Sequence, residues 1–168
     1  MRKLFLTAYV LILSLAAIPA HAQSETKWFG SWQLVDGGPD TGCLATFRQG
    51  TEQFHLYAGP ISDGALMFRS DAITQMDPAE DVPVELTWFV EGGQNAVATV
   101  PATVRALGAD GRVLGINIPL DQVTSKLLVH PRMAARSGGV TLFDITLPAD
   151  QNSAALYAAF LECRSRNL

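Results

Sequence analysis

Apolar and polar residues alternate with a period of two through the middle of the chain. The clearest series is Val84–Val90, where Val, Leu, Trp and Val alternate with Glu, Thr and Phe. The same alternation occurs in Gln53–Tyr57, Leu66–Ser70 and Thr141–Leu147. In a strand this period puts successive side chains on opposite faces, so that one face is buried and the other is wet. The pattern predicts antiparallel strands.

Turn residues separate further strands. Ala96–Ala106 and Val113–Pro119 flank the pair Asp110-Gly111, which supplies the positive φ that a tight hairpin turn needs. Pro101 inside the first of these strands predicts a bend or an edge position, because proline cannot donate to a ladder. The remaining strands are expected at Lys27–Val35 and Cys43–Arg48.

The end of the chain shows helical spacing instead. Leu156, Phe160 and Cys163 are spaced i, i+4, i+7 and therefore lie on one face of a helix that is expected to run from about Asp150 to Arg164. A shorter helix is expected at Asp121–His130. Together these elements predict an α+β, mostly β fold. We expect an antiparallel β-sandwich or a partly closed barrel of seven to eight strands, with the C-terminal helix packed on it.

The N-terminal segment has the pattern of a secretory signal. Arg2 and Lys3 precede an apolar run, Leu4–Ile18, and the triplet Ala20-His21-Ala22 is typical of a cleavage site. The run is shorter than the ~20 residues of a membrane-spanning helix. We therefore expect residues 1–22 to be a cleaved signal peptide and residues 23–168 to form one exported domain, periplasmic or secreted, with no integral membrane segment.

Charge excludes two classes of partner. Without Arg2 and Lys3, the 12 basic residues of the chain fall to ten against 16 acidic ones, a net charge near −6. The basic residues are scattered singly from Lys27 to Arg166. Nucleic acids and anionic membrane surfaces both require a clustered basic patch. We therefore expect a partner of neither kind.

Cys43 and Cys163 are the two cysteines of the chain. An even number in an exported protein predicts a disulfide. Cys163 lies on the face of its helix that is expected to be buried, and Cys43 opens an apolar stretch that can reach it. Two buried thiols or one reactive thiol are the alternatives. No C-x-x-C motif supports redox catalysis.

The common catalytic and metal-binding motifs are absent from the sequence. His55 and His130 stand alone, without the spacing of zinc ligands, and the acidic residues at 77–81 lack the spacing of a calcium loop. There is no G-x-S-x-G motif and no phosphate-binding loop with its lysine. We therefore expect no catalytic residue, no metal and no cofactor.

A few aromatic and apolar side chains are candidates for a ligand or partner surface. Trp28 and Trp32 share one face if their segment is a single strand; this favours a core role, with a ligand platform as the alternative. Met67 and Phe89 fall on the nominally wet faces of their strands. We expect a second sheet to cover them, and an exposed patch for a partner is the alternative.

Several segments resemble a class of small periplasmic proteins of proteobacteria. The segments are Trp32 followed by Gly42-Cys43, then Phe143–Leu147 leading into Ala154-Ala155-Leu156, and finally Cys163. In these segments the chain is similar to invasion-associated locus B-like proteins. The resemblance implies an exported β-rich domain that ends in a strand and a helix, with an accessory or surface-interaction role and no catalytic residues.

These observations predict a non-enzymatic periplasmic or secreted domain that binds a protein or a cell-envelope component. Two alternatives remain open. One is a carrier of a small apolar ligand in a barrel-like core, which requires a cavity of several hundred Å³. The other is an envelope hydrolase with a dispersed site, which requires a histidine within hydrogen-bond reach of a carboxylate and a hydroxyl.

Overall fold

The computed structural model describes residues 24–108 and 111–168. The expected signal peptide, residues 1–22, and the two turn residues 109–110 lie outside this range. Ten antiparallel strands form one open sheet with the order β1-β2-β3-β4-β5-β8-β7-β6-β9-β10. The strands are β1 (Glu25–Phe29), β2 (Trp32–Asp36), β3 (Cys43–Gln49), β4 (Glu52–Gly59), β5 (Ser62–Arg69), β6 (Ala79–Trp88), β7 (Ala96–Leu107), β8 (Gly111–Asn117), β9 (Arg132–Ser137) and β10 (Val140–Thr146). The predicted α+β, mostly β class is confirmed.

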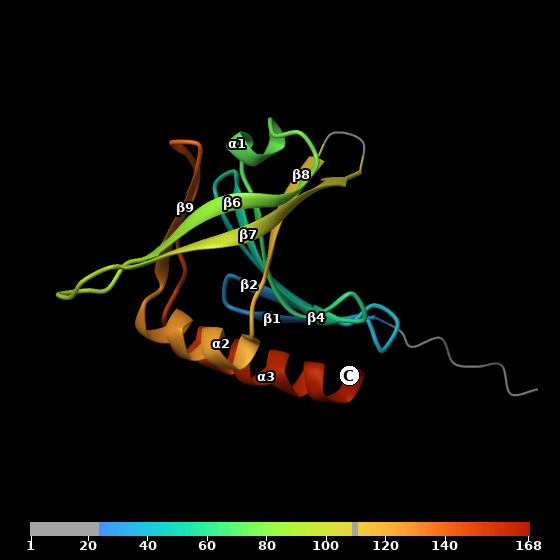
Figure 1. Ribbon diagram of the computed structural model, residues 1–168. Helices are drawn as coiled ribbons and strands as arrows, with labels where there is room; N and C mark the ends of the chain where they lie inside the picture. Colours follow the sequence, from blue (N-terminus) through green and yellow to red (C-terminus); the bar gives the residue numbers. More distant parts are fainter. Residues whose placement is uncertain (1–23, 109–110) are drawn as a thin grey trace, which may run out of the picture.

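In the described residues, three helices accompany the sheet: α1 (Asp71–Thr74), α2 (Leu120–Val129) and α3 (Gln151–Asn167). The helix α3 begins after Asp150, whose carboxylate accepts a hydrogen bond from the Ser153 backbone N–H at 2.9 Å. It packs on β1 to β4. In Figure 1, α2 and α3 lie side by side below the first strands, and α1 lies at the opposite end of the molecule.

The sheet has two strands more than the largest number predicted. The segment expected as one strand at Lys27–Val35 is the hairpin β1–β2, because Gly30 takes a φ of +58° and turns the chain after Phe29. Strand β9 was not predicted, because its buried face consists of Met133 and Ala135 alone and gives a weak alternation in the sequence. Pro101 lies opposite Pro83, at a point where β7 pairs with β6 alone, in keeping with the expected edge position.

One face of the sheet forms the core, and Trp32 lies within it. The Trp32 side chain is fully buried against Phe47, Phe54 and Tyr157, with ring centroids 5.2 to 6.0 Å away. Its indole N–H donates to the Ser153 hydroxyl at 3.1 Å, so that the one polar group of this side chain is satisfied. Trp32 is therefore a core residue that anchors the start of α3, in keeping with the favoured core role, and its burial excludes the alternative of a ligand platform for this residue.

The sheet curls until β10 meets the β3–β4 hairpin. The Asp144 backbone N–H donates to the Glu52 carboxylate at 3.1 Å, and the Thr146 backbone N–H donates to the Gln49 side-chain oxygen at 3.2 Å. The Ser70 hydroxyl donates to the Leu142 carbonyl. Side chains of β3, β4 and the start of α1 thus occupy hydrogen-bonding groups along the edge of β10. The sheet is open, because β10 and β1 do not pair, but side chains cover the outer edge of β10.

The second sheet that was expected to cover Met67 and Phe89 is not formed, since all ten strands of the described residues belong to one sheet. Met67 faces outward on β5 and is half-buried. Phe89 follows the end of β6, where the Arg132 guanidinium lies over its ring at 4.2 Å from the centroid. Of the two architectures that were expected, a sandwich or a partly closed barrel, the sandwich is not formed, because the strands make one open, curled sheet. A single sheet suffices because its curl and three helices enclose the apolar face.

Candidate functional site

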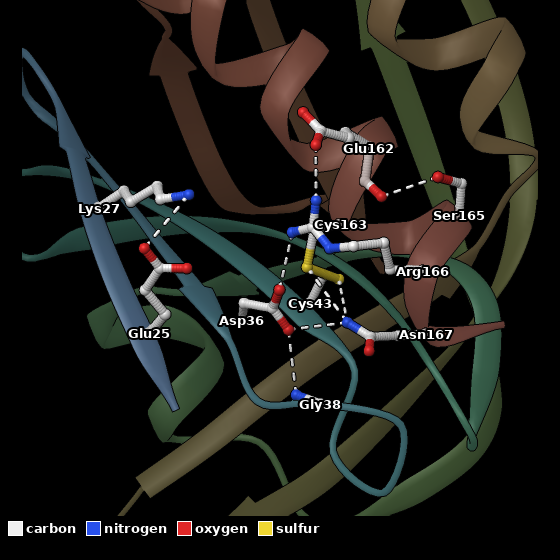
Figure 2. Close-up of polar contacts among 10 residues, drawn as sticks. All are labelled: Glu25, Lys27, Asp36, Gly38, Cys43, Glu162, Cys163, Ser165, Arg166 and Asn167. Atoms are coloured by element: carbon white, nitrogen blue, oxygen red, sulfur yellow. Dashed lines mark hydrogen bonds and ion pairs between the residues drawn. A yellow bond between two sulfur atoms is a disulfide. The ribbon is translucent and has the colours of Figure 1, made fainter. Parts of the chain in front are cut away.

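The disulfide between Cys43 and Cys163 fastens α3 to β3. Both cysteines are fully buried, and their Cα atoms lie 6.1 Å apart. Figure 2 shows the Asn167 amide beside the bridge, with its nitrogen 3.4 Å from one sulfur and 3.5 Å from the other. The predicted pairing is confirmed. It joins residues separated by 120 positions, and this separation indicates a structural bond.

Asp36, at the end of β2, holds the C-terminal turn of α3 by polar contacts (Figure 2). Its carboxylate accepts hydrogen bonds from Arg166 at 2.9 Å, from the Asn167 amide at 2.8 Å and from the Gly38 backbone N–H at 3.1 Å. Burial alone would raise the pKa of Asp36, but these hydrogen bonds and the charge of Arg166 outweigh it and lower the pKa below 3.8. The carboxylate stays ionised at neutral pH.

Asp36, Cys43 and Cys163 together bring potential metal-ligand atoms within 4.8 Å of one another. The two sulfurs are bonded to each other, however, and a disulfide has no thiolate to offer a metal. The carboxylate already binds Arg166 and Asn167. The cluster is therefore a clamp on the chain terminus and does not fit a metal.

The four candidate residues for a ligand or partner surface lie in different environments. Trp32 is in the core, whereas Trp28, on β1, is 68% exposed. Phe89 is half-buried beneath Arg132. Met67 lies on the outer face of the sheet, the face opposite the core, and lines a hollow there. The structure does not gather these residues into one platform.

The outer-face hollow lies over the four neighbouring strands β4, β5, β8 and β7. The register places His55, Met67, Gly115 and Thr103 in one row across these strands. Because Gly115 has no side chain, the row is open at that point, and a hollow of about 130 Å³ results. Its lining combines apolar side chains with polar ones: Tyr57, Ile61, Ala65, Met67 and Val113 on the one hand, and Ser62, Thr103, Arg105 and Asn117 on the other.

The surroundings of the hollow are basic. Arg48 and Arg69 lie close enough to His55 to lower its pKa, in addition to the larger effect of burial, and the value falls from 6.5 to about 4. The ring is neutral at pH 7, and its Nδ1 lies 2.9 Å from the Thr46 hydroxyl. Arg105 adds a third guanidinium on the wall. The outer face thus combines a small, partly apolar opening with several positive charges.

In the described part of the chain, no histidine has both a hydroxyl and a carboxylate within hydrogen-bond distance, the arrangement that the hydrolase alternative requires. The His55 ring contacts the hydroxyl of Thr46, and no carboxylate bonds to it there. His130 caps the end of α2 through its backbone. Glu80 and Asp81 lie at a bulge near the start of β6 and are exposed. In the described ranges, none of the helices has the length and apolarity needed to cross a membrane.

Comparisons of the chain with family models, with curated proteins and with solved structures give no match. The similarity to invasion-associated locus B-like proteins therefore stays a prediction made from the sequence.

The hollow itself was missed in the sequence, although one signal was present. A glycine inside an apolar strand, here Gly115, often marks a close approach or a gap on the sheet. Met67 was singled out as an apolar residue on a wet face. Met67 and Gly115 are 48 positions apart in the chain and become neighbours through the pairing of β5 with β8. That register depends on the fold of the whole sheet.

Proposed function

We propose that the chain is an exported, non-enzymatic domain that binds a protein partner through the outer-face hollow. The observation that carries the proposal is the hollow around Gly115, a partly apolar opening on the outside of a sheet whose other face forms the buried core. The signal-like N-terminus and the disulfide support export, because disulfides persist in oxidising compartments.

The size of the hollow favours a side chain of a partner over a free small ligand. Sites for small molecules are typically about 300–1,000 Å³, and the hollow holds about 130 Å³. Wider depressions of about 380, 400 and 450 Å³ are shallow and open to solvent. This argues against the carrier alternative. One aliphatic side chain that projects from a partner fits the hollow best.

Charge defines the partner further. Arg105 on the wall, with Arg48 and Arg69 around His55, gives the opening a positive field. A carboxylate next to the inserted apolar side chain would be attracted to these guanidinium groups, which bind carboxylates in a bidentate manner. The proposed ligand is therefore a protein segment that carries an aliphatic residue beside an acidic one.

The test is to fill the hollow without disturbing the fold. A Cβ at Gly115 would meet only the Thr103 carbonyl, at an ordinary contact distance of 3.8 Å, so Gly115→Val should fold. Ala98→Val is the matched control, because Ala98 is an exposed position on β7 outside the hollow. Both variants and the wild type are immobilised, exposed to envelope extract and compared by mass spectrometry.

We expect proteins captured by the wild type and by Ala98→Val to be lost from Gly115→Val. Equal capture by all three would reject the hollow as the binding site. Release of the captured proteins by raised salt would support the charged component, since the guanidinium groups are partly exposed and screened by ions.

A further inference from the structure

We propose that two copies of this chain associate through the free edge of β1, in antiparallel register with Thr26 opposite Thr26 of the second copy. The proposal concerns β1 and does not depend on the outer-face hollow. It starts from an asymmetry between the two edges of the sheet.

The two edge strands, β10 and β1, differ in how their backbone groups are used. Along β10, the backbone N–H groups of Asp144 and Thr146 and the Leu142 carbonyl are bound by side chains. Within residues 24–108 and 111–168, no such side-chain bond reaches the backbone of β1, which pairs on one side with β2. An uncovered edge of this kind is a template for another strand.

The hairpin turn decides which groups face the free edge. A two-residue turn, Gly30-Ser31, connects Phe29 to Trp32, so these two flanking residues exchange backbone hydrogen bonds with each other. Alternation then directs the backbone groups of Lys27 and Glu25 towards β2. The N–H and C=O groups of Ser24, Thr26 and Trp28 point outward and are available to a partner strand.

Charge selects one register among those that this alternation allows. With Thr26 opposite Thr26, Glu25 of each copy faces Lys27 of the other, in the closely spaced pairs that do not share backbone hydrogen bonds. A shift by one pair in either direction would set Lys27 against Lys27, or Glu25 against Glu25. Within one copy, Lys27 and Glu25 form an ion pair with each other at 3.3 Å; because Lys27 is 47% and Glu25 is 60% exposed, each can exchange this partner for the opposite charge on the second copy.

The same register accounts for Trp28, the most exposed aromatic side chain on the described surface, at 68%. Trp28 lies on the outer face of β1, and in this register it faces Ser24 of the second copy, with Thr26 of that copy diagonal to it. Each copy thus covers the indole of the other. The dimer has twofold symmetry, because the same residues contribute from both sides.

The first experiment is sedimentation equilibrium of the exported, disulfide-bonded protein over a concentration series up to about 1 mM, the range in which small interfaces dissociate. We expect a reversible monomer–dimer equilibrium, with a blue shift of tryptophan emission as the dimer forms. Trp32 and Trp88 are already buried, so this shift would report on Trp28. A monomer at all concentrations would overturn the proposal and would leave the hollow's role untouched.

Charge reversal tests the register. Lys27→Glu and Glu25→Lys each set like charges opposite one another at both symmetry-related pairs, and each should weaken the dimer about tenfold or more. An equimolar mixture of the two variants restores opposite charges in both pairs, and it should form a mixed dimer at wild-type strength. So should the double variant Glu25→Lys/Lys27→Glu. Unchanged single variants, or a mixture that stays monomeric, would refute the register.

Thr26→Pro tests the hydrogen bonds at the centre. The proline removes an N–H that points away from β2, a position at which edge strands tolerate proline. We expect the loss of the dimer with an unchanged melting temperature of the monomer. A dimer that persists in Thr26→Pro would show that it forms elsewhere, and would overturn the proposal.

Discussion

The strongest prediction on stability concerns the removal of the disulfide in Cys43→Ala/Cys163→Ala. The bond closes a loop between residues 120 positions apart. In the chain-entropy description, a loop of this length restricts the unfolded chain by about 5 kcal/mol at 25 °C. The double replacement leaves no unpaired thiol in the core. The difference in unfolding free energy from the wild type therefore reports the loss of the cross-link together with the loss of two sulfur atoms from the core.

The other contacts of α3 cannot replace this contribution. Arg166 bonds to Asp36, and Arg164 bonds to Asp63, but Arg166 is 47% exposed and the Asp63 side chain is 73% exposed. Exposed ion pairs contribute about 0–1 kcal/mol each. The apolar contacts of Phe160 and Leu156 are present with or without the bridge. We therefore expect a loss of about 3–5 kcal/mol.

For a domain of this size, such a loss corresponds to a fall in melting temperature of about 10–15 °C. The measurement is thermal unfolding at neutral pH by circular dichroism, with His55→Ala as the comparison, because that change removes a half-buried ring and one hydrogen bond. We expect the disulfide variant to melt far below His55→Ala. Equal melting temperatures would refute the view that the bridge is the main fastening of α3.

Three further predictions concern the side chains of His55, Tyr157 and Glu52. Because burial and then Arg48 and Arg69 lower the pKa of His55 from 6.5 to about 4, the unfolded chain binds a proton in this window that the folded protein does not. Stability should therefore fall by up to about 3 kcal/mol as the pH is lowered from 6.5 to 4, and His55→Gln should abolish this component in chemical denaturation. The buried Tyr157 hydroxyl has no hydrogen-bond partner among the described residues, so Tyr157→Phe should leave the unfolding free energy unchanged or raise it by about 1 kcal/mol; a loss above that size would reveal a partner. Glu52→Ala removes the acceptor of the Asp144 backbone N–H, and hydrogen exchange of that amide should become faster while strand β9 stays protected; unchanged exchange would argue against the covered edge.

The sequence pattern predicted those parts of the fold that depend on neighbours along the chain. Period-two alternation located most of the strands, since burial of one face leaves its trace directly in the residue types. Helical spacing placed Leu156, Phe160 and Cys163 on one buried face, as found. The pairing of Cys43 with Cys163 was predicted because an exported chain with two cysteines has one way to form an intramolecular disulfide.

The failures occurred where local residues are ambiguous. The pair Gly30-Ser31 between aromatic residues is compatible with one continuous strand, and a continuous strand would give Trp28 and Trp32 a common face that they do not share. The expectation of a second sheet came from Met67 and Phe89, but apolar residues on an outer face are also found where a hollow or a cation lies above them. The candidate site depends on cross-strand register, which no local pattern encodes.

In-cell photocrosslinking tests the claim that a protein partner occupies the outer-face hollow. A photoreactive amino acid replaces Ile61, which is 81% exposed at the wall of the hollow, or Val97, which is 57% exposed on the β6–β7 hairpin away from it. We predict a covalent adduct of higher mass after irradiation of the Ile61 variant and none from the Val97 variant. Adducts of equal yield from both positions, or none from Ile61, would contradict the claim.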